Sequence, residues 1–410
     1  MYPNMNVLIF ASSYRSYTAL QNVYVELVLK EVPTFFLYSM ETDVKHPILD
    51  MDKFNYDTNI NTDFSSGYFM RSLGLNIPFK PDIVLLARER WQPEQSIILE
   101  SKSFGSKVYV VEVSSHIINN IENRLEMLSR DSVIPQSLVD GYFEHSEFAR
   151  QRRSDCLYPE WINKSIVVGN PRFDLLRDID EERCIKKYKI DKNKKQILFW
   201  GIINTSRNRS FEFLRQLHER LKDTHQIFYK PNPQEPSNPA FIHQFNPFVI
   251  PEIQVIYDDM DTNTMSSLCD IHMSSISSVC QYSFYFKKKL CILNSVCQID
   301  LMTNDFSRYT DESKEGVEDS ALFWMSVFGI KSHEEFSKMI DLNRVNKFTE
   351  TNNLVNQICK DNTTLCDGNF EFLNDMSEPK SSFIKLFDEF NDRSASQRIV
   401  NYLLTLQDKK

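Results

Sequence analysis

The stretch NVLIFASS, residues 6–13, indicates the fold of the first half of the chain. It is a compact apolar run that ends in small polar residues, and a helical pattern follows from about Tyr17. A buried strand, a polar turn and a helix in this order open an α/β domain. Further apolar runs at residues 34–38, 82–87 and 107–113 predict a doubly wound domain around a parallel sheet.

A second series of apolar runs predicts a second α/β domain. It begins with KQILFWGIINTS at residue 195 and continues with QIFYKPNP, EIQVIYDD, LCDIHMSS and KKKLCILN. The charged stretch RDIDEERCIKKYKIDKNKK between the two series fits a surface helix and a linker. We therefore expect domains at residues 1–175 and 176–385. The last segment, residues 386–410, has apolar residues at helical spacing and is expected to pack back across both domains.

Two other segments break these patterns. DFSSGYFMRSLGLNIPFKP, residues 63–81, interrupts the first series and predicts an irregular excursion near an acceptor site. DDMD, residues 258–261, is interpreted as a solvated turn, so no metal site is expected there.

Length and composition limit the class of protein. A chain of 410 residues suits two domains, and 41% hydrophobic residues provide a core for each. Only nine glycines are present, with no GxGxxG and no P-loop motif, which disfavours the common dinucleotide and triphosphate sites. A net charge of -9 argues against nucleic acid as a partner. The eight cysteines form no CxxC pair, so we expect reduced thiols in a cytoplasmic protein and no zinc.

The chain shows neither an export signal at its N-terminus nor a run of 18 apolar residues. We expect a cytoplasmic protein that neither is exported nor spans a membrane. Contact with the inner face of the membrane stays open.

The most specific segment is DGYFEHSEFARQRRSDCLYPEWINKSIVVGNPRFDLL, residues 140–176. It resembles the end of the N-terminal domain in GT-B enzymes of surface-polysaccharide synthesis, including the CDP-glycerol glycerophosphotransferases. In those enzymes a strand leads to a Ser-Glu turn, and a later strand leads to a Gly-x-Pro-Arg-x-Asp turn. The matching residues here are Ser146, Glu147, Gly169, Pro171, Arg172 and Asp174.

This resemblance implies an α/β protein of the GT-B type, with two Rossmann-like domains facing a central cleft and a C-terminal helix that crosses back. Gly169 permits a positive φ or a close backbone approach, and Pro171 stiffens the turn. Arg172 is then a candidate for binding the donor phosphate. The alternative is a local ion pair between Arg172 and Asp174.

The second motif is FYKPNPQEP, residues 228–236, which resembles the Lys-Pro-x-Pro loop beside the donor in the same enzymes. Lys230 is a candidate for contacting the donor phosphate, and the alternative is an exposed lysine on a stiff turn. The retaining β-Kdo transferases, which the chain also resembles, carry a nucleophilic Asp in this loop. Asn232 stands at that position, and an amide cannot act as such a nucleophile. Asn232 therefore indicates an inactivated or engineered enzyme, or a different mechanism.

Two further clusters predict contacts to the donor. In CDIHMSSISSVCQYSFYFKKKLCIL, residues 269–293, serines follow a strand and would lie at a helix N-terminus, where phosphate is favoured. The alternative is a serine-rich cap with the histidine in the core. In WGIINTSRNRS, residues 200–210, polar side chains follow the first strand of the second domain. The candidates from both clusters are His272, Ser274, Ser275, Ser277, Ser278, Asn204, Ser206 and Arg207.

Acceptor contacts and a general base are expected at strand ends of the first domain. Ser13 and Arg15 follow the first strand, and Arg88 follows the run at residues 82–87. A general base must lie close to the attacking hydroxyl, and Glu89 or Glu112 fits by position.

These resemblances imply a metal-independent glycosyltransferase of lipopolysaccharide O-antigen or capsule synthesis. The resemblance to the retaining β-Kdo transferases implies CMP-Kdo as the donor, with transfer of Kdo with retention to a lipid-linked or oligosaccharide acceptor. No cofactor other than this nucleotide-sugar substrate is expected. The alternatives are a CDP-glycerol-type glycerophosphotransferase, a non-catalytic GT-B-like scaffold that binds glycan, and a nucleotide-sugar epimerase of the same shape.

Overall fold

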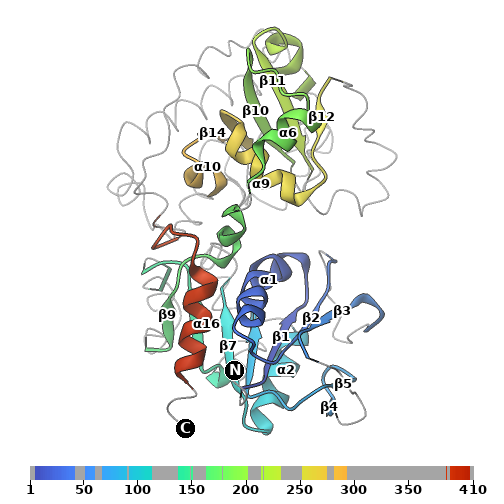
Figure 1. Ribbon diagram of the computed structural model, residues 1–410, viewed down its shortest axis with the longest axis vertical. Helices are drawn as coiled ribbons and strands as arrows, with labels where there is room; N and C mark the ends of the chain where they lie inside the picture. Colours follow the sequence, from blue (N-terminus) through green and yellow to red (C-terminus); the bar gives the residue numbers. More distant parts are fainter. Residues whose placement is uncertain are drawn as a thin grey trace, which may run out of the picture. The chain divides into compact units, whose positions relative to one another are not determined.

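The chain forms two units, each built on an open sheet whose strand pairs are all or nearly all parallel (Figure 1). Unit 1 comprises residues 1–177 and 385–410, and unit 2 comprises residues 178–384. The computed structural model describes residues 5–41, 51–60, 67–89, 92–112, 137–147, 149–150, 163–177, 179–201, 214–215, 217–231, 252–274, 281–292, 385 and 388–406.

Unit 1 contains a seven-stranded sheet, and all its strand pairs are parallel except β2 with β3. The strands expected from the apolar runs are confirmed. The antiparallel edge strand β3 was not predicted, because its residues NYDT are polar and largely exposed. In sheet order the strands are β3 (Asn55–Thr58), β2 (Thr34–Tyr38), β1 (Val7–Ala11), β6 (Ile83–Leu86), β7 (Lys107–Val111), β8 (Gly141–Glu144) and β9 (Ser165–Val167).

Helices cover both faces of this sheet, which explains why its central strands are apolar throughout. Alternate residues of β1 belong to different core clusters, with Ile9 in one and Phe10 in the other. The Ile9 cluster includes side chains of α1 (Tyr14–Leu29) and α16 (Ala395–Thr405). The Phe10 cluster includes side chains of α2 (Gln92–Ser103). Period-two alternation of side chains thus builds two separate cores from one strand.

The expected irregular excursion contains regular structure. β4 (Tyr68–Met70) pairs antiparallel with β5 (Leu75–Ile77). Met70, Leu73 and Ile77 are buried in the Phe10 cluster. These apolar residues anchor the hairpin to the core. The hairpin was not predicted because each of its strands has only three residues, which is too short to give a clear pattern.

The C-terminal helix α16 is an integral part of unit 1. Ile399, Val400 and Leu403 are fully buried in the Ile9 cluster, together with Leu20 and Val23 of α1. The helical spacing of its apolar residues therefore reflects a real buried face.

Unit 2 contains a five-stranded sheet in which every pair is parallel. Its strands confirm the second apolar series. Helix α6 (Glu181–Lys187), capped by the Asp180 side chain, α9 (Asp259–Leu268) and α10 (Gln281–Tyr285) accompany them. In sheet order the strands are β12 (Gln254–Val255), β11 (His225–Lys230), β10 (Lys195–Trp200), β13 (Ile271–Ser274) and β14 (Lys289–Ile292).

The expectation of a solvated turn at residues 258–261 is wrong, because α9 begins there and Asp261 is fully buried. The Asp261 carboxylate accepts hydrogen bonds from Arg183, from Lys187 at 2.5 Å and from Tyr188 at 2.7 Å. Burial alone would raise the pKa of Asp261, but the hydrogen bonds from Lys187 and Tyr188 and the positive charges outweigh it and lower the pKa. Asp261 thus joins α6 to α9 within unit 2.

Candidate functional site

Each sheet has a topological switch point, a pair of neighbouring strands from which the chain extends the sheet first in one direction and then in the other. In unit 1 this point lies between β1 and β6, which are paired in parallel. In unit 2 it lies between β10 and β13. Ligands of open α/β sheets bind beyond the carboxyl ends of the strands at this point, so the residues there are the first candidates for a site.

In unit 1, polar side chains from both strands meet at the switch point. Ser12 and Ser13 follow β1, and Arg88 follows β6. The guanidinium of Arg88 donates to the hydroxyl of Ser13 and, at 3.1 Å, to that of Ser16. Ser13 is also the N-cap of α1, where it accepts a hydrogen bond from the backbone of Ser16. The sequence thus predicted two residues, Ser13 and Arg88, that the structure brings into contact.

Glu94 completes this cluster from the first turn of α2. Its side chain is fully buried, and Ser12 donates a hydrogen bond to Oε1. Oε2 is also buried and has no hydrogen-bond partner among the described residues. Burial raises the pKa of Glu94 to about 7, although Arg88 and Ser12 oppose the shift. Glu94 is therefore a buried carboxyl group that can exchange a proton near neutral pH.

The two predicted bases lie farther along the same edge of the sheet. Glu89 follows β6 and Glu112 follows β7, and both are buried. The backbone N–H of Glu112 donates to the carbonyl of Phe143 at 3.0 Å, and its own carbonyl is hydrogen bonded to the His145 ring. Their role as a base stays a prediction.

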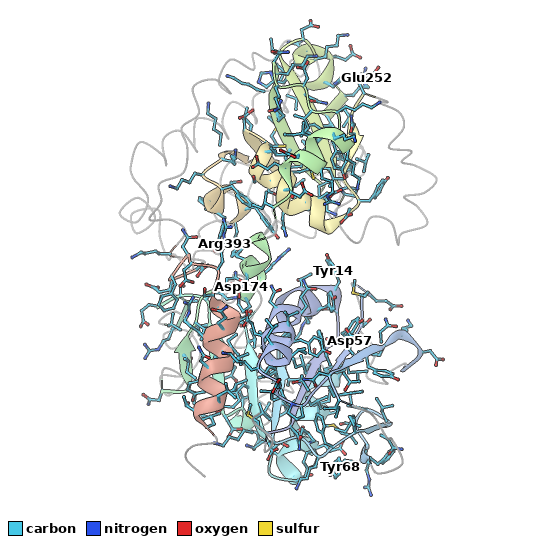
Figure 2. All side chains as sticks on the ribbon, viewed as in Figure 1. Tyr14, Asp57, Tyr68, Asp174, Glu252 and Arg393 are labelled. Atoms are coloured by element: carbon cyan, nitrogen blue, oxygen red, sulfur yellow. The ribbon has the colours of Figure 1, made fainter. Side chains whose placement is uncertain are left out.

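The Gly-x-Pro-Arg-x-Asp turn holds the C-terminal helix. Gly169 has a φ of +90°, as its predicted conformational role requires. The Asp174 carboxylate accepts hydrogen bonds from the backbone of Ala395 at 3.2 Å and Ser396 at 2.7 Å. Figure 2 shows Asp174 beside the first turn of α16. Arg172 is partly exposed in the 3-10 helix η5 (Pro171–Arg177), and its backbone N–H donates to the Asn170 side chain. This turn therefore has a structural role that the sequence motif alone did not reveal.

In unit 2, Trp200 ends β10 at the switch point. It is buried, and its ring stacks on Tyr282 with centroids 5.6 Å apart. The indole N–H is buried without an acceptor in the described part of the chain. Two of the buried polar atoms that lack a partner among the described residues, Oε2 of Glu94 and Nε1 of Trp200, thus lie near the switch points of the two sheets, while others lie elsewhere.

His272 lies in the core beneath Trp200. It is fully buried, and both ring nitrogens are hydrogen bonded, one to the Ser283 hydroxyl at 2.9 Å and one to the Ser266 carbonyl at 3.0 Å. Burial lowers its pKa to about 3, so the ring is neutral. This geometry matches the core alternative and leaves His272 no free nitrogen for a donor phosphate.

Lys230 ends β11, beside Trp200 of β10 in the parallel register. It is buried, which excludes the alternative of an exposed lysine. Its ammonium group donates to the Tyr257 carbonyl at 3.4 Å. A buried ammonium group at this edge has the charge that a donor phosphate requires.

Several predicted residues lie outside the described structure. Ser274 is the last residue of β13, and Arg15 lies in the first turn of α1, but their side chains are not among those described. The remaining residues of this group are Asn204, Ser206, Arg207, Asn232, Ser275, Ser277 and Ser278.

Sequence reasoning missed Glu94 and Trp200. Glu94 lies inside a helix and not directly after a strand. The only feature of the sequence that could have indicated a functional role is its position in the first turn of α2, the helix that follows β6. Trp200 opens the segment WGIINTSRNRS, in which only the polar side chains are expected to contact the donor, because a tryptophan at the end of an apolar strand has the pattern of an ordinary core residue.

No cluster of three or more His, Cys, Asp or Glu side chains suited to a metal occurs in the ranges described above. Within those ranges, no helix is both long and apolar enough to cross a bilayer.

No family model and no curated protein matches the sequence. Solved structures match in fold. A variant of the wall teichoic acid polymerase TagF has a TM-score of 0.57 at 10% identity, covering 100% of this chain and 90% of its own. The UDP-GlcNAc 2-epimerase of Neisseria meningitidis, bound to UDP-GlcNAc, has a TM-score of 0.54 at 15% identity, and the match covers 98% of this chain and 100% of that enzyme's chain.

MnaA of S. aureus, solved with UDP, has a TM-score of 0.54 at 12% identity over 98% of this chain and 97% of its own. At these identities the similarity concerns the fold. Together with the two open α/β sheets described above, it shows that this chain has the GT-B fold with two Rossmann-like units.

Proposed function

We propose that this chain is a GT-B enzyme of bacterial surface-glycan synthesis that transfers a sugar or sugar-like unit from a nucleotide-activated donor. The observation that carries the proposal is the set of buried ionisable groups at the carboxyl edges of both sheets. Glu94 and Lys230 are buried there, where open α/β sheets bind their ligands. Burial of an ionisable group is unfavourable without partners, and such groups gather at active sites, which supports a site at these edges.

The proposal assigns the nucleotide donor to unit 2 and the acceptor glycan to unit 1. Lys230 supplies a positive charge in unit 2, and Trp200 offers an N–H that lacks an acceptor among the described residues. Arg88 and Ser13 provide hydrogen-bonding groups for an acceptor in unit 1. We also propose that Arg172 and the loop residues around Asn204 and Asn232 contact the donor.

The finer proposal is CMP-Kdo as the donor, transferred with retention in O-antigen or capsule synthesis in the cytoplasm, at the inner face of the membrane. It depends on the sequence resemblance to the retaining β-Kdo transferases. CDP-glycerol is the alternative donor, and a TagF variant solved after a soak with CDPG supports it, with a TM-score of 0.53 at 10% identity.

Epimerisation of a nucleotide sugar is the second candidate function. MnaA was solved with UDP, and the Neisseria meningitidis protein, a UDP-GlcNAc 2-epimerase, was solved with UDP-GlcNAc. Glu89 and Glu112 are buried carboxyl groups that can serve such proton transfers. Turnover of a nucleotide sugar in the absence of any acceptor would distinguish this function from transfer.

Thermal unfolding in the presence of CMP, CDP, UDP, CMP-Kdo, CDP-glycerol and UDP-GlcNAc tests the proposal. A ligand that binds the folded state stabilises it by about 2.7 kcal/mol at a concentration of 100 Kd. We expect one nucleotide family to raise the melting temperature. Absence of a shift with every nucleotide would overturn the enzyme proposal and favour a glycan-binding scaffold.

Two variants locate the nucleotide. Lys230→Met should remove most of the shift, while Lys222→Met, which changes a lysine that is 53% exposed, should retain it. Trp200→Phe keeps the buried aromatic ring and removes the indole N–H. We expect a lower ligand-free melting temperature, because the smaller ring leaves a cavity, and a nucleotide shift that is reduced when it is measured against the variant's own ligand-free value.

A further inference from the structure

Lysines cluster at the amino edge of the unit 2 sheet, opposite the edge that holds Trp200 and Lys230. Every strand pair in this sheet is parallel, so the segments that enter its strands all lie at that edge. Residues 189–195, 269–270 and 286–289 enter β10, β13 and β14. We call their lysines the basic edge: Lys189, Lys192, Lys194 and Lys195 in the first segment, and Lys287, Lys288 and Lys289 in the third.

The basic edge has the opposite charge to the chain as a whole. Its three segments contain seven lysines and two aspartates, a formal charge of +5, while the whole chain carries -9. Residues 219–225, which enter β11, contain two acidic side chains, two basic side chains and a histidine. Positive charge is therefore concentrated where the neighbouring strands β10, β13 and β14 begin.

The two aspartates of these segments have structural roles, whereas three of the lysines have exposed charges. The carboxylate of Asp191 accepts a backbone hydrogen bond at 3.0 Å, and that of Asp270 accepts one at 2.9 Å. Lys189, Lys192 and Lys287 are exposed and form no ion pair with any residue that the structure describes. Their charges can therefore meet a partner outside the described part of the chain.

Local structure explains only part of the basic edge. Lys189 follows the end of α6 and Lys287 follows the end of α10, where the helix dipole favours a cation. Both also have a positive φ, +46° and +54°, a conformation that favours glycine over lysine. Lys192 and Lys195 lie beyond the last helical turn, where the dipole effect has fallen off. An anionic partner would account for the whole set.

The arrangement of the charges suits the surface of an anionic bilayer. The lysines come from separate segments along one edge, so they present charge over an extended surface. Each basic residue close to an anionic leaflet strengthens binding roughly fivefold. The net charge of -9 disfavours nucleic acid as the partner, because the rest of the chain would repel its phosphates.

We propose that the basic edge binds unit 2 to anionic lipid headgroups at a membrane surface. This inference rests on the proposed function and deepens it, because it names the surface that contacts the membrane. Trp200 and Lys230 end their strands at the opposite edge of the same sheet. Contact through the basic edge therefore leaves the proposed donor site of unit 2 uncovered.

Co-sedimentation of the full chain with lipid vesicles tests this surface. The probes are vesicles of phosphatidylcholine alone and vesicles of phosphatidylcholine mixed with phosphatidylglycerol. At about 0.1 M salt we expect binding only to the vesicles that contain phosphatidylglycerol. At about 1 M salt the Debye length falls from about 10 Å to about 3 Å, so the protein should be released.

A variant that combines Lys189→Gln, Lys192→Gln and Lys287→Gln should weaken vesicle binding roughly hundredfold, because three charges are lost. A second variant with arginine at the same three positions keeps the charges and should bind as the unmodified protein does. The matched control replaces three exposed lysines of unit 1 by glutamine: Lys30, Lys53 and Lys80. It has the same net charge as the first variant and should retain nearly all of the affinity.

Three results would overturn the proposal. The first is equal affinity of the unmodified protein and the folded glutamine variant of the basic edge. The second is absence of binding to the anionic vesicles, or equal binding to vesicles without phosphatidylglycerol. The third is tighter binding of duplex DNA than of vesicles through the same lysines, which would assign the basic edge to nucleic acid.

The nucleotide titration separates this failure from failure of the proposed function. The glutamine variant of the basic edge should retain the nucleotide shift of the unmodified protein. A nucleotide shift without vesicle binding would leave the enzyme proposal standing and remove the membrane surface. Vesicle binding that depends on the basic edge, without any nucleotide shift, would retain the membrane surface in a protein that is not this enzyme.

Discussion

The carboxylate of Asp174 accepts a hydrogen bond from the backbone N–H of Ser396 at 2.7 Å, although 222 positions separate the two residues. Ala395 donates to the same carboxylate at 3.2 Å. Ser394, the N-cap of α16, makes no side-chain capping hydrogen bond. Asp174 therefore caps this helix from a distant part of unit 1 and favours it electrostatically as a negative charge at a helix N-terminus.

We expect Asp174→Ala to destabilise unit 1 by about 1–2 kcal/mol, as loss of a helix cap does. Urea unfolding followed by circular dichroism would measure the change. Asp174→Asn should cost less, because its side-chain oxygen still accepts one hydrogen bond. Equal midpoints for the unmodified protein and Asp174→Ala would contradict the capping role.

Gly169 supports a second prediction, which separates backbone strain from steric clash. Gly169 has a φ of +90°, and a Cβ there would lie 2.7 Å from the Asp388 side chain and 3.0 Å from that of Arg398. Gly105 has a similar φ of +84°, but a Cβ there meets nothing within 4 Å. Both alanine variants strain the backbone by about 1 kcal/mol or more.

Only Gly169→Ala also displaces the groups that hold the C-terminal segment. Its melting temperature should therefore fall below that of Gly105→Ala. If the two variants melt together, the contact of Gly169 with Asp388 and Arg398 has no energetic importance.

The sequence predicted the central strands of the two sheets because they are compact apolar runs, separated by segments long enough to form helices. It failed where tertiary contacts decide the environment. Asp261 belongs to an acidic run, DDMD, that resembles a surface turn, yet Arg183, Lys187 and Tyr188 reach it from 73 to 78 positions away. Charge partners so distant in sequence leave no local pattern.

The candidate site shows the same limit. Ser13 and Arg88 were predicted because both follow strands, and parallel strands place their carboxyl ends together. Glu94 and Trp200 depend on burial, which position after a strand does not reveal. His272 directly follows Ile271 in β13, and only the structure shows that Ser266 and Ser283 occupy both its nitrogens.

Asp261 gives a third prediction. Asp261→Asn should destabilise unit 2 by about 1–3 kcal/mol at pH 7, because charge-assisted hydrogen bonds are lost. Lys187 and Arg183 are each 45% exposed, so water partly solvates the charges left behind. Asp258→Asn, at a position that is 43% exposed and 3.8 Å from Lys187, should change stability by less than about 0.5 kcal/mol.

The pH dependence of this stability difference tests whether the negative charge of Asp261 is responsible for it. The pKa of Asp261 is lowered in the folded state, so its stabilisation is present above the ordinary value of 3.8 and is lost as the pH falls through the folded value. The difference between Asp261→Asn and the unmodified protein should shrink in acid. A constant difference from pH 7 to pH 3 would show that the charge is not responsible.

Glu94 has the opposite dependence. Its pKa rises from 4.5 to about 7 on folding, so the unfolded state releases its proton first. Stability should therefore fall as the pH rises from about 4.5 to about 7 and stay lower above that range, by roughly 3.5 kcal/mol in all, since each pKa unit corresponds to about 1.4 kcal/mol. Glu94→Gln cannot ionise, so this component of the pH dependence should be absent from its denaturation midpoints.

Denaturation at pH 5, 6, 7 and 8 would compare Glu94→Gln with the unmodified protein and with Glu31→Gln, which changes an exposed carboxylate beyond the C-terminal end of α1, as the control. The stability of Glu94→Gln relative to the unmodified protein should increase from pH 5 to pH 7 and level off by pH 8. Arg88 and Glu89 act on Glu94 with opposite signs, and burial exceeds both effects. Parallel pH profiles for all three proteins would mean that Glu94 stays ionised in the folded chain, and that a positive charge or a solvent path compensates its burial.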